Sequence, residues 1–141
     1  VPGVTSALSG GALLGAPMGH DFCAISLSDL LTPWEVIENR LRCAAAGDFS
    51  MAIYNPASHK RPDYLRRACD ILLDAGVSPG TVCGYVRNTG RAGEEAHVTT
   101  LAQLRDAPLD MFCTAFIGSS STLADHGRMI APRGYEKKRA L

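Results

Sequence analysis

The strongest constraint on the fold of this chain is that runs of strand length alternate with segments that carry helix signals. The run 111–117 is apolar almost without interruption, which is typical of a strand at the centre of a sheet. Alternation of this kind predicts an α/β sandwich in a single domain. The expected strands lie at 22–27, 49–54, 81–86, 97–100 and 111–117.

Capping residues mark where the helices should begin. Thr5 precedes a segment rich in Ala and Gly, which predicts a capped helix that packs closely against its neighbour. Thr32 and Glu35 have the spacing of a capping box, with Pro at the first helical position between them. Thr100 and Gln103 repeat that spacing before a brief helix. The three longer expected helices cover 5–14, 32–47 and 62–76.

Composition excludes several classes of protein. The chain has 141 residues, of which 46% are apolar and 20% charged, so it can bury one globular core. Its 14 basic and 14 acidic residues leave no net charge, which argues against a nucleic-acid partner. No apolar run approaches the ~20 residues of a membrane helix, and no signal peptide is visible. We therefore expect a cytoplasmic protein without a membrane partner.

The cysteines and histidines do not have the spacing of a disulfide framework or a metal site. There are five cysteines, an odd number, and no Cys-x-x-Cys pair. The four histidines are scattered as well. We expect reduced thiols, as in a cytosolic protein, and no metal. The cysteines are Cys23, Cys43, Cys69, Cys83 and Cys113.

Polar breaks follow three of the expected strands, at 55–56, 88–90 and 118–120. Each break alone is typical of a turn. In open α/β sheets, however, ligands bind beyond the carboxyl ends of strands, so the three breaks together favour a shared crevice. Asp21 and Asp29 are possible acid–base groups, although such residues are more often surface or capping groups.

Other catalytic motifs are missing. The serines at 119–121 have no nearby pattern of His and acid that would make one of them a nucleophile. The sequence also lacks the Gly-rich dinucleotide and P-loop fingerprints. No catalytic residue is therefore identified from the sequence.

Several segments in combination resemble the tetrapyrrole methylases that use S-adenosylmethionine (SAM). The segment 1–7, Val-Pro-Gly-Val-Thr-Ser-Ala, is similar to the Pro-Gly-Ile/Val-Thr/Ser-Ala segment of that family. Further segments narrow the resemblance to the ring-contracting C17-methyltransferases of cobalamin biosynthesis. They are 19–34, 54–58, 60–62, 86–88, 117–122 and 132–135.

The resemblance implies an activity, a cofactor and its site. The activity would be methylation of C17 of precorrin-3B, or of its cobalt form, with ring contraction to precorrin-4, and S-adenosylhomocysteine would be the product of the cofactor. Such transfer needs alignment of carbon, methyl and sulfur more than acid–base help. The carboxylates of the precorrin-type substrate need cationic partners, for which we expect Arg87, Arg91 and Arg133. The implied SAM-binding residues are Thr5, Ser6, Tyr54, Asn55, Asn88, Thr89, Cys113 and Thr114.

The resemblance also implies a domain organisation. It implies that 1–136 corresponds to the C-terminal α/β domain of a methylase, with an about five-stranded mixed sheet flanked by helices. Residues 137–141 would be a disordered basic tail. The resemblance further implies that this sequence lacks the N-terminal domain that completes the cleft in the family, so the chain would hold half a cleft. A homodimer is expected, and the alternative function is a non-catalytic dimerisation or ligand-holding module.

Overall fold

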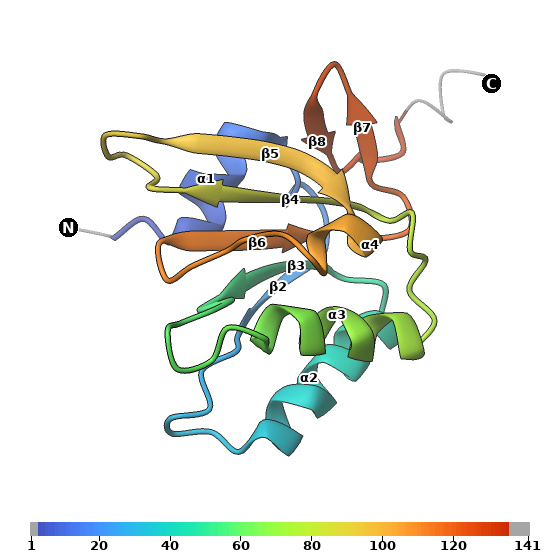
Figure 1. Ribbon diagram of the computed structural model, residues 1–141. Helices are drawn as coiled ribbons and strands as arrows, with labels where there is room; N and C mark the ends of the chain where they lie inside the picture. The colour runs from blue at the N-terminus through green and yellow to red at the C-terminus, as the bar shows by residue number, and fades with distance from the viewer. Residues whose placement is uncertain (1–2, 136–141) are drawn as a thin grey trace.

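The computed structural model describes residues 3–135, which form four helices and two sheets (Figure 1). The predicted tail, 137–141, lies outside these residues. The helices are α1 (Ser6–Leu14), α2 (Trp34–Ala46), α3 (Tyr64–Asp74) and α4 (Leu101–Leu104). The strands are β1 (Gly15–Ala16), β2 (Phe22–Ser26), β3 (Ser50–Tyr54), β4 (Val82–Arg87), β5 (Glu95–Thr100), β6 (Cys113–Ile117), β7 (Leu123–Asp125) and β8 (Arg128–Ile130).

The main sheet has five strands in the order β2-β3-β6-β4-β5. Strands β2 and β3 are parallel, and every other neighbouring pair is antiparallel. This confirms the α/β fold with a five-stranded mixed sheet, and it confirms the central position of the apolar strand β6. Because β3 and β4 both run antiparallel to β6, the carboxyl ends of β3 and β4 lie at the same edge as the amino end of β6.

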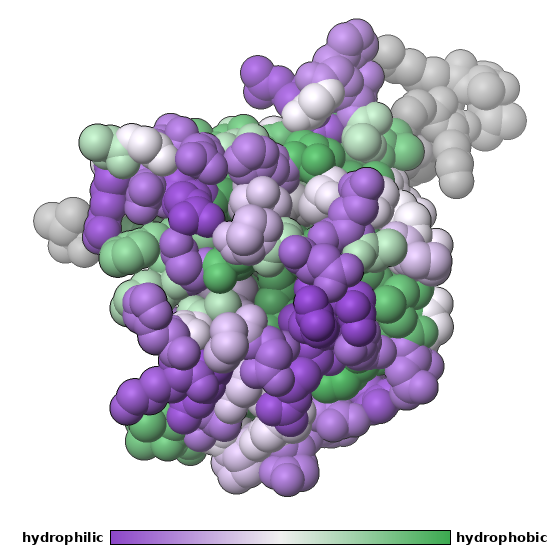
Figure 2. Space-filling model, in the orientation of Figure 1, coloured by the Kyte–Doolittle hydropathy of each residue, from purple (hydrophilic) through white to green (hydrophobic). Residues whose placement is uncertain are grey.

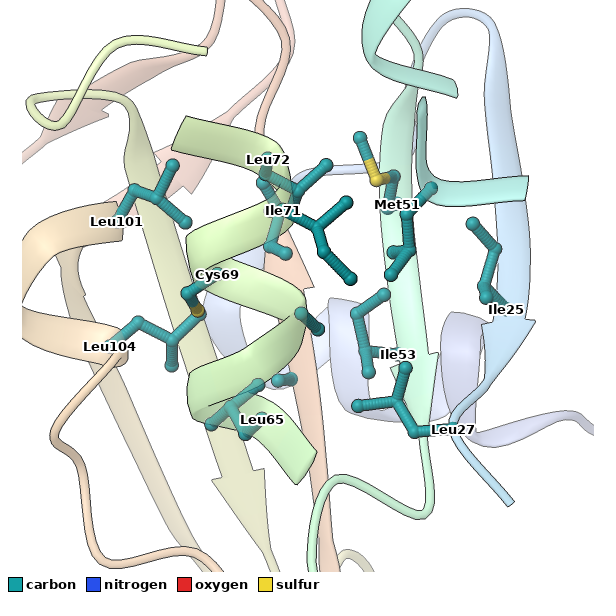
Figure 3. Close-up of a cluster of buried hydrophobic side chains, with 14 of the residues drawn as sticks. Ile25, Leu27, Met51, Ile53, Leu65, Cys69, Ile71, Leu72, Leu101 and Leu104 are labelled. Carbon is teal, nitrogen blue, oxygen red and sulfur yellow. The ribbon is translucent and has the colours of Figure 1, made fainter. Parts of the chain in front are cut away.

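Alternating residues of the strands pack on opposite faces of the sheet. On one face, α2 and α3 cover Ala115 and Ile117 of β6 within the larger core cluster. Figure 3 shows side chains of this cluster, among them Leu65 and Leu72 of α3. On the other face, α1 covers Phe116 of β6 together with Val86 of β4. The sheet is thus the middle of three layers, and the two cores lie on either side of it.

Glycines allow α1 to lie close to the sheet, as its composition predicts. A Cβ on Gly10 would lie 2.8 Å from Val86 Cγ2 and 3.2 Å from Phe116 Cζ. A Cβ on Gly84 of β4 would lie 2.9 Å from Leu14 Cδ1. Any larger residue at either position would push the helix away from the strands.

A second sheet, in the order β1-β8-β7, was not expected from the sequence. Its strands have only two or three residues each, and β1 pairs with β8 across more than a hundred residues of sequence. Met129 of β8 is fully buried against the α1 face of the main sheet. Strands of two or three residues are too short to show an alternation of apolar and polar residues, so the sequence does not predict them.

The cap predictions for the first two helices are corrected by the structure. Thr5 is the N-cap residue of α1, but its hydroxyl bonds the hydroxyl of Tyr54 and not a helix N–H. Helix α2 has Pro33 as its N-cap and no side-chain cap, so the box of Thr32 and Glu35 does not form. Proline fits there because its ring holds φ near −65°, which is compatible with the extended conformation of Pro33 (φ −55°, ψ 144°).

Only one of the two hydrogen bonds of the predicted capping box forms at the start of α4. The Thr100 hydroxyl accepts the N–H of Gln103 at 3.4 Å, as predicted. The Gln103 side chain instead accepts a hydrogen bond from the Thr99 hydroxyl at 2.9 Å. In the part of the chain that the structure describes, no helix is both long enough and apolar enough to cross a membrane.

Candidate functional site

One edge of the main sheet gathers most of the residues predicted to form the site. Tyr54 ends β3, and Asn88 directly follows β4. Cys113 begins β6 and pairs with Arg87 at the end of β4. We call this edge the carboxyl edge, and it lies at the left of Figure 1, where the turn after β4 and the start of α1 also lie.

The third polar break is not at this edge, which corrects the prediction of a crevice shared by all three. Ile117, the last residue of β6, pairs with Met51 near the start of β3 and with Cys83 near the start of β4. The turn 118–122 therefore lies at the opposite edge. The prediction assumed parallel strands, whereas β6 runs against its neighbours.

The Tyr54 hydroxyl joins the end of β3 to the start of α1. It bonds the hydroxyl of Thr5 and accepts the N–H of Ala7 at 3.1 Å. These two bonds bring Thr5 and Ser6 against the carboxyl edge, although about fifty residues separate them from Tyr54. The start of a helix offers backbone N–H groups that suit electronegative ligand atoms.

Asn55 and Asn88 have the same left-handed backbone conformation, with φ of 53° and 51°. Asn is among the few residues that tolerate this conformation. The side-chain amide of Asn55 donates to Ser26 Oγ at 3.0 Å, which ties β2 to β3. The backbone N–H of Asn88 donates to the carbonyl of Phe112 at 3.2 Å. The sequence marked both residues as turns, but not their handedness.

Three hollows open along the carboxyl edge, and each is named here by one residue. The Thr89 hollow has a volume of about 380 Å³. The Asn55 hollow has about 120 Å³, and the His59 hollow about 330 Å³. Figure 2 shows hydrophilic and apolar residues side by side along the left margin of the molecule. The Thr89 hollow is lined by Ser6, Asn88, Thr89, Arg91, Met111, Phe112, Cys113 and Thr114.

The structure thus brings together five of the predicted SAM-binding residues in one hollow: Ser6, Asn88, Thr89, Cys113 and Thr114. Asn55 lines the adjacent Asn55 hollow. Thr5 and Tyr54 bond each other beside them and do not line the Thr89 hollow.

Cys113 is a protonated thiol at neutral pH. Burial raises its pKa, and the thiol donates to Asp110 Oδ1 at 3.4 Å. It therefore lacks the thiolate that a nucleophile requires. Among residues 3–135, no three side chains of His, Cys, Asp or Glu gather in the way that a metal ion would need.

The three predicted substrate arginines have different surroundings. Arg87 donates to Asp110 at 2.6 Å and to the carbonyl of Pro108 at 2.9 Å, so its charge is already paired. Arg133 donates to the carbonyl of Gly19, before β2, and lines none of the three hollows. Arg91 lines the Thr89 hollow and has no ion-pair partner among the described residues.

Asp29 belongs to a structural cluster beside the Asn55 hollow. Its carboxylate lies 2.8 Å from Arg61 Nη2 and accepts a hydrogen bond from the Tyr64 hydroxyl. That hydrogen bond, with burial, raises the pKa of Tyr64. Arg61 lies over the Tyr64 ring at 5.6 Å and lines the hollow, so it is a site residue that sequence reasoning missed. The Lys-Arg pair at 60–61 is the sequence feature that could have identified it.

The family of this chain follows from comparison with known proteins. Residues 1–105 match the tetrapyrrole (corrin/porphyrin) methylases. The chain belongs to this family. The chain is 47% identical, over 96% of its length, to a probable cobalt-factor III C(17)-methyltransferase from Salmonella typhimurium (strain LT2). It is 47% identical, over 86% of its length, to a precorrin-3B C(17)-methyltransferase from Sinorhizobium sp.

A solved structure agrees with this membership. The methyltransferase CobJ is 40% identical to this chain, with a TM-score of 0.84 over 93% of it. The chain covers 56% of the Salmonella relative, 47% of the Sinorhizobium relative and 54% of CobJ. This methylase chain therefore spans about half the length of the proteins it matches.

Proposed function

We propose that this chain is the half of a SAM-dependent C-methyltransferase that carries the Thr89 hollow. Its substrate would be a precorrin-type tetrapyrrole of cobalamin biosynthesis, methylated at C17 with ring contraction. The observation that carries the proposal is the gathering of Ser6, Thr89 and Thr114 around one hollow, in a chain whose relatives are named C17-methyltransferases. The names of those relatives support both precorrin-3B and cobalt-factor III as substrates.

The residues around the hollow suit SAM, which would supply an activated methyl group when bound. A volume of about 380 Å³ falls within the range of small-molecule sites. The hydroxyls of Ser6, Thr89 and Thr114 offer hydrogen bonds to ribose or amino-acid groups. The chain's residues would bind and orient the cofactor and exclude water. This role requires no nucleophilic side chain, which agrees with the protonated state of Cys113.

Calorimetric titration with S-adenosylhomocysteine tests the cofactor site. We expect micromolar binding to the folded chain, and we expect Thr89→Trp to weaken it by about tenfold or more, because the indole fills the hollow. Ser121→Trp, an exposed position at the opposite edge, is the matched control and should bind like the original chain. A folded chain that binds no S-adenosylhomocysteine contradicts the proposal. Transfer of labelled methyl to precorrin-3B or cobalt-factor III then distinguishes the substrates.

We also propose that two copies of the chain associate along β2. This strand is an outer strand of the main sheet, and residues 22–28 carry no charge. Phe22 is 43% exposed, and uncharged outer strands of this kind favour pairing with another strand. Ala24→Lys should convert a dimer to a monomer in light scattering, whereas Ala96→Lys on the other outer strand, β5, should not. A monomeric original chain would contradict this.

A further inference from the structure

The three hollows of the carboxyl edge meet at two adjacent apolar residues. Met111 lines all three hollows, and Phe112 lines the Thr89 and His59 hollows. Both side chains are largely exposed, Met111 by 61% and Phe112 by 54%. We call these two residues the apolar platform.

The sequence predicts the opposite for these residues, since it places them in the buried strand 111–117. The structure begins β6 only at Cys113, after a hydrogen-bonded turn. Asp110 Oδ1 accepts the N–H of Phe112 at 2.9 Å, and the Asp110 carbonyl accepts the N–H of Cys113 at 3.2 Å. Arg87 holds Asp110 in place from β4. The turn is thus fixed by specific bonds, and it keeps the two apolar side chains in solvent.

This exposure is unfavourable in the free chain. Burying a side chain such as Met or Phe stabilises a protein by roughly 1.5–3 kcal/mol. Single exposed apolar residues are common, but two neighbours where three hollows meet are typical of a binding surface. Met adapts its shape to a ligand, and Phe stacks on flat rings.

Cationic side chains lie on different sides of the platform. Arg91 lines the Thr89 hollow, and Arg61 lines the Asn55 hollow. His59 lines the third hollow, where the acidic residue Asp110 is already paired with Arg87. A ligand on Met111 therefore has a guanidinium within reach in two separate hollows. Guanidinium groups bind carboxylates with two hydrogen bonds. Arg61 is ion-paired with Asp29 through Nη2 alone and lines a hollow, whereas Arg87 engages both of its Nη groups and lines none of the three hollows.

We propose that Met111 and Phe112 carry the ring of the tetrapyrrole, while Arg61 and Arg91 bind carboxylates on separate sides of that ring. The inference rests on the proposed function and assigns its substrate to named residues. A flat apolar ring with acidic groups around its rim matches an apolar centre between cations. A fatty acid, with one acidic end, would leave one of the two arginines without a partner. The platform also borders the Thr89 hollow, so a ring held there lies beside the cofactor site.

Fluorescence titration of the full chain with uroporphyrin III, a stable porphyrin with carboxylates around its rim, tests this assignment. Met111→Glu should weaken binding by about tenfold or more, because it removes apolar contact and adds a charge that repels carboxylates. Arg61→Gln and Arg91→Gln should each weaken it by a few-fold to about tenfold. Leu31→Glu, at another apolar side chain that is 94% exposed, is the matched control and should bind like the original chain.

The outcomes separate this inference from the cofactor proposal. Unchanged melting temperatures are expected for Met111→Glu, Arg91→Gln and Leu31→Glu, at exposed positions. Arg61→Gln also removes the ion pair with Asp29, so a lower melting temperature is expected there, and its circular dichroism must show a folded chain. A chain that binds S-adenosylhomocysteine but not uroporphyrin III overturns the platform and leaves the cofactor site standing. A chain that binds the porphyrin alone supports the platform and contradicts the cofactor site. Porphyrin binding that Met111→Glu leaves unchanged, or that neither arginine variant weakens, overturns the assignment.

Discussion

The two edges of the main sheet differ in what their loops do with polar groups. The larger hollow, about 480 Å³, lies at the edge opposite the proposed site, beside the turn 118–122. There Thr122 Oγ1 accepts the N–H of Ser119 at 2.9 Å, and Asp48 accepts the N–H of Ser120 at 2.8 Å. The carboxyl edge instead leaves Arg91 without an ion-pair partner in the described chain and leaves Met111 exposed.

The larger hollow is therefore the one whose polar groups are already bonded to one another. At the opposite edge, hydroxyls and carboxylate bond one another, so few groups remain for a ligand and the turn has a structural role. At the carboxyl edge, the neighbouring exposed apolar side chains are typical of a binding surface, and Arg91, which has no ion-pair partner among the described residues, keeps its donors for a ligand. Changes at the first edge should therefore affect folding, and changes at the second should affect binding.

The largest effect is expected from Gly118→Ala at the opposite edge. A Cβ there would lie 2.6 Å from both Thr122 Cβ and the carbonyl oxygen of Val82. Backbone cannot move aside cheaply, so we expect the free energy of unfolding to fall by about 3 kcal/mol. Urea denaturation measures this fall.

Gly80→Ala in the same hollow is the control for that experiment. Its Cβ would meet nothing closer than Ser78 Oγ at 3.7 Å, so stability should change by less than about 0.5 kcal/mol. Equal effects of the two substitutions would show that the turn is not tightly packed. Binding of S-adenosylhomocysteine to folded Gly118→Ala should be unchanged.

A second effect concerns the thiols of the interior between the two edges. Burial raises the pKa of Cys69 and of Cys83 to about 12, from an ordinary value of 9.0. The unfolded chain ionises first, so the contribution of these two thiols to stability is constant well below pH 9 and is lost progressively as the pH rises toward 12. At pH 10 each thiol should remove about 1.4 kcal/mol.

Unfolding free energies measured from pH 7 to pH 10.5 check this prediction. Cys83→Ala should reduce the loss at high pH, whatever its stability at pH 7. Cys43→Ala, at an exposed thiol, should leave the pH dependence unchanged. A slope that Cys83→Ala does not alter would mean that other groups dominate the alkaline loss.

The sequence predicted those features that depend on local patterns. Strands β2, β3, β4 and β6 were found because their apolar stretches are nearly continuous, and the central place of β6 followed from 111–117 being apolar on both faces. Strand direction was not predicted, because no local pattern distinguishes a strand that runs up from one that runs down. For that reason the turn 118–122 was expected at the wrong edge.

The candidate site was predicted only in part, because contacts between distant segments are not visible in a local sequence pattern. Family resemblance identified Ser6, Thr89 and Thr114, and the fold brings them into one hollow. The role of Met111 could not be read, because its apolar neighbours suggest a strand and only the Asp110 turn, held by Arg87, keeps it exposed. Exposure set by a contact between distant segments leaves no trace in a local pattern.

A third effect, at the carboxyl edge, is expected from Tyr54→Phe. Without the hydroxyl, the N–H of Ala7 and the hydroxyl of Thr5 lose their partner, which should cost about 1.5 kcal/mol of stability. The start of α1 would loosen, and S-adenosylhomocysteine affinity should fall by about tenfold. Tyr85→Phe, whose ring stacks on His97, is the control and should keep full affinity. Unchanged affinity in Tyr54→Phe would remove α1 from the site.

The smallest effect is expected from substitutions of Asn88, which test whether its backbone or its side chain contacts the ligand. Its φ of 51° disfavours Ala, so Asn88→Ala should cost about 1 kcal/mol, whereas Asn88→Gly should fold normally. The side chain of Asn88 makes only a 3.5 Å contact with the carbonyl of Gly93, so the turn itself is what the hollow presents. Asn88→Gly should therefore keep S-adenosylhomocysteine affinity within about twofold. His126→Gly, at another left-handed turn far from the hollow, controls for the backbone change, and a large loss confined to Asn88→Gly would show that the amide itself contacts the ligand.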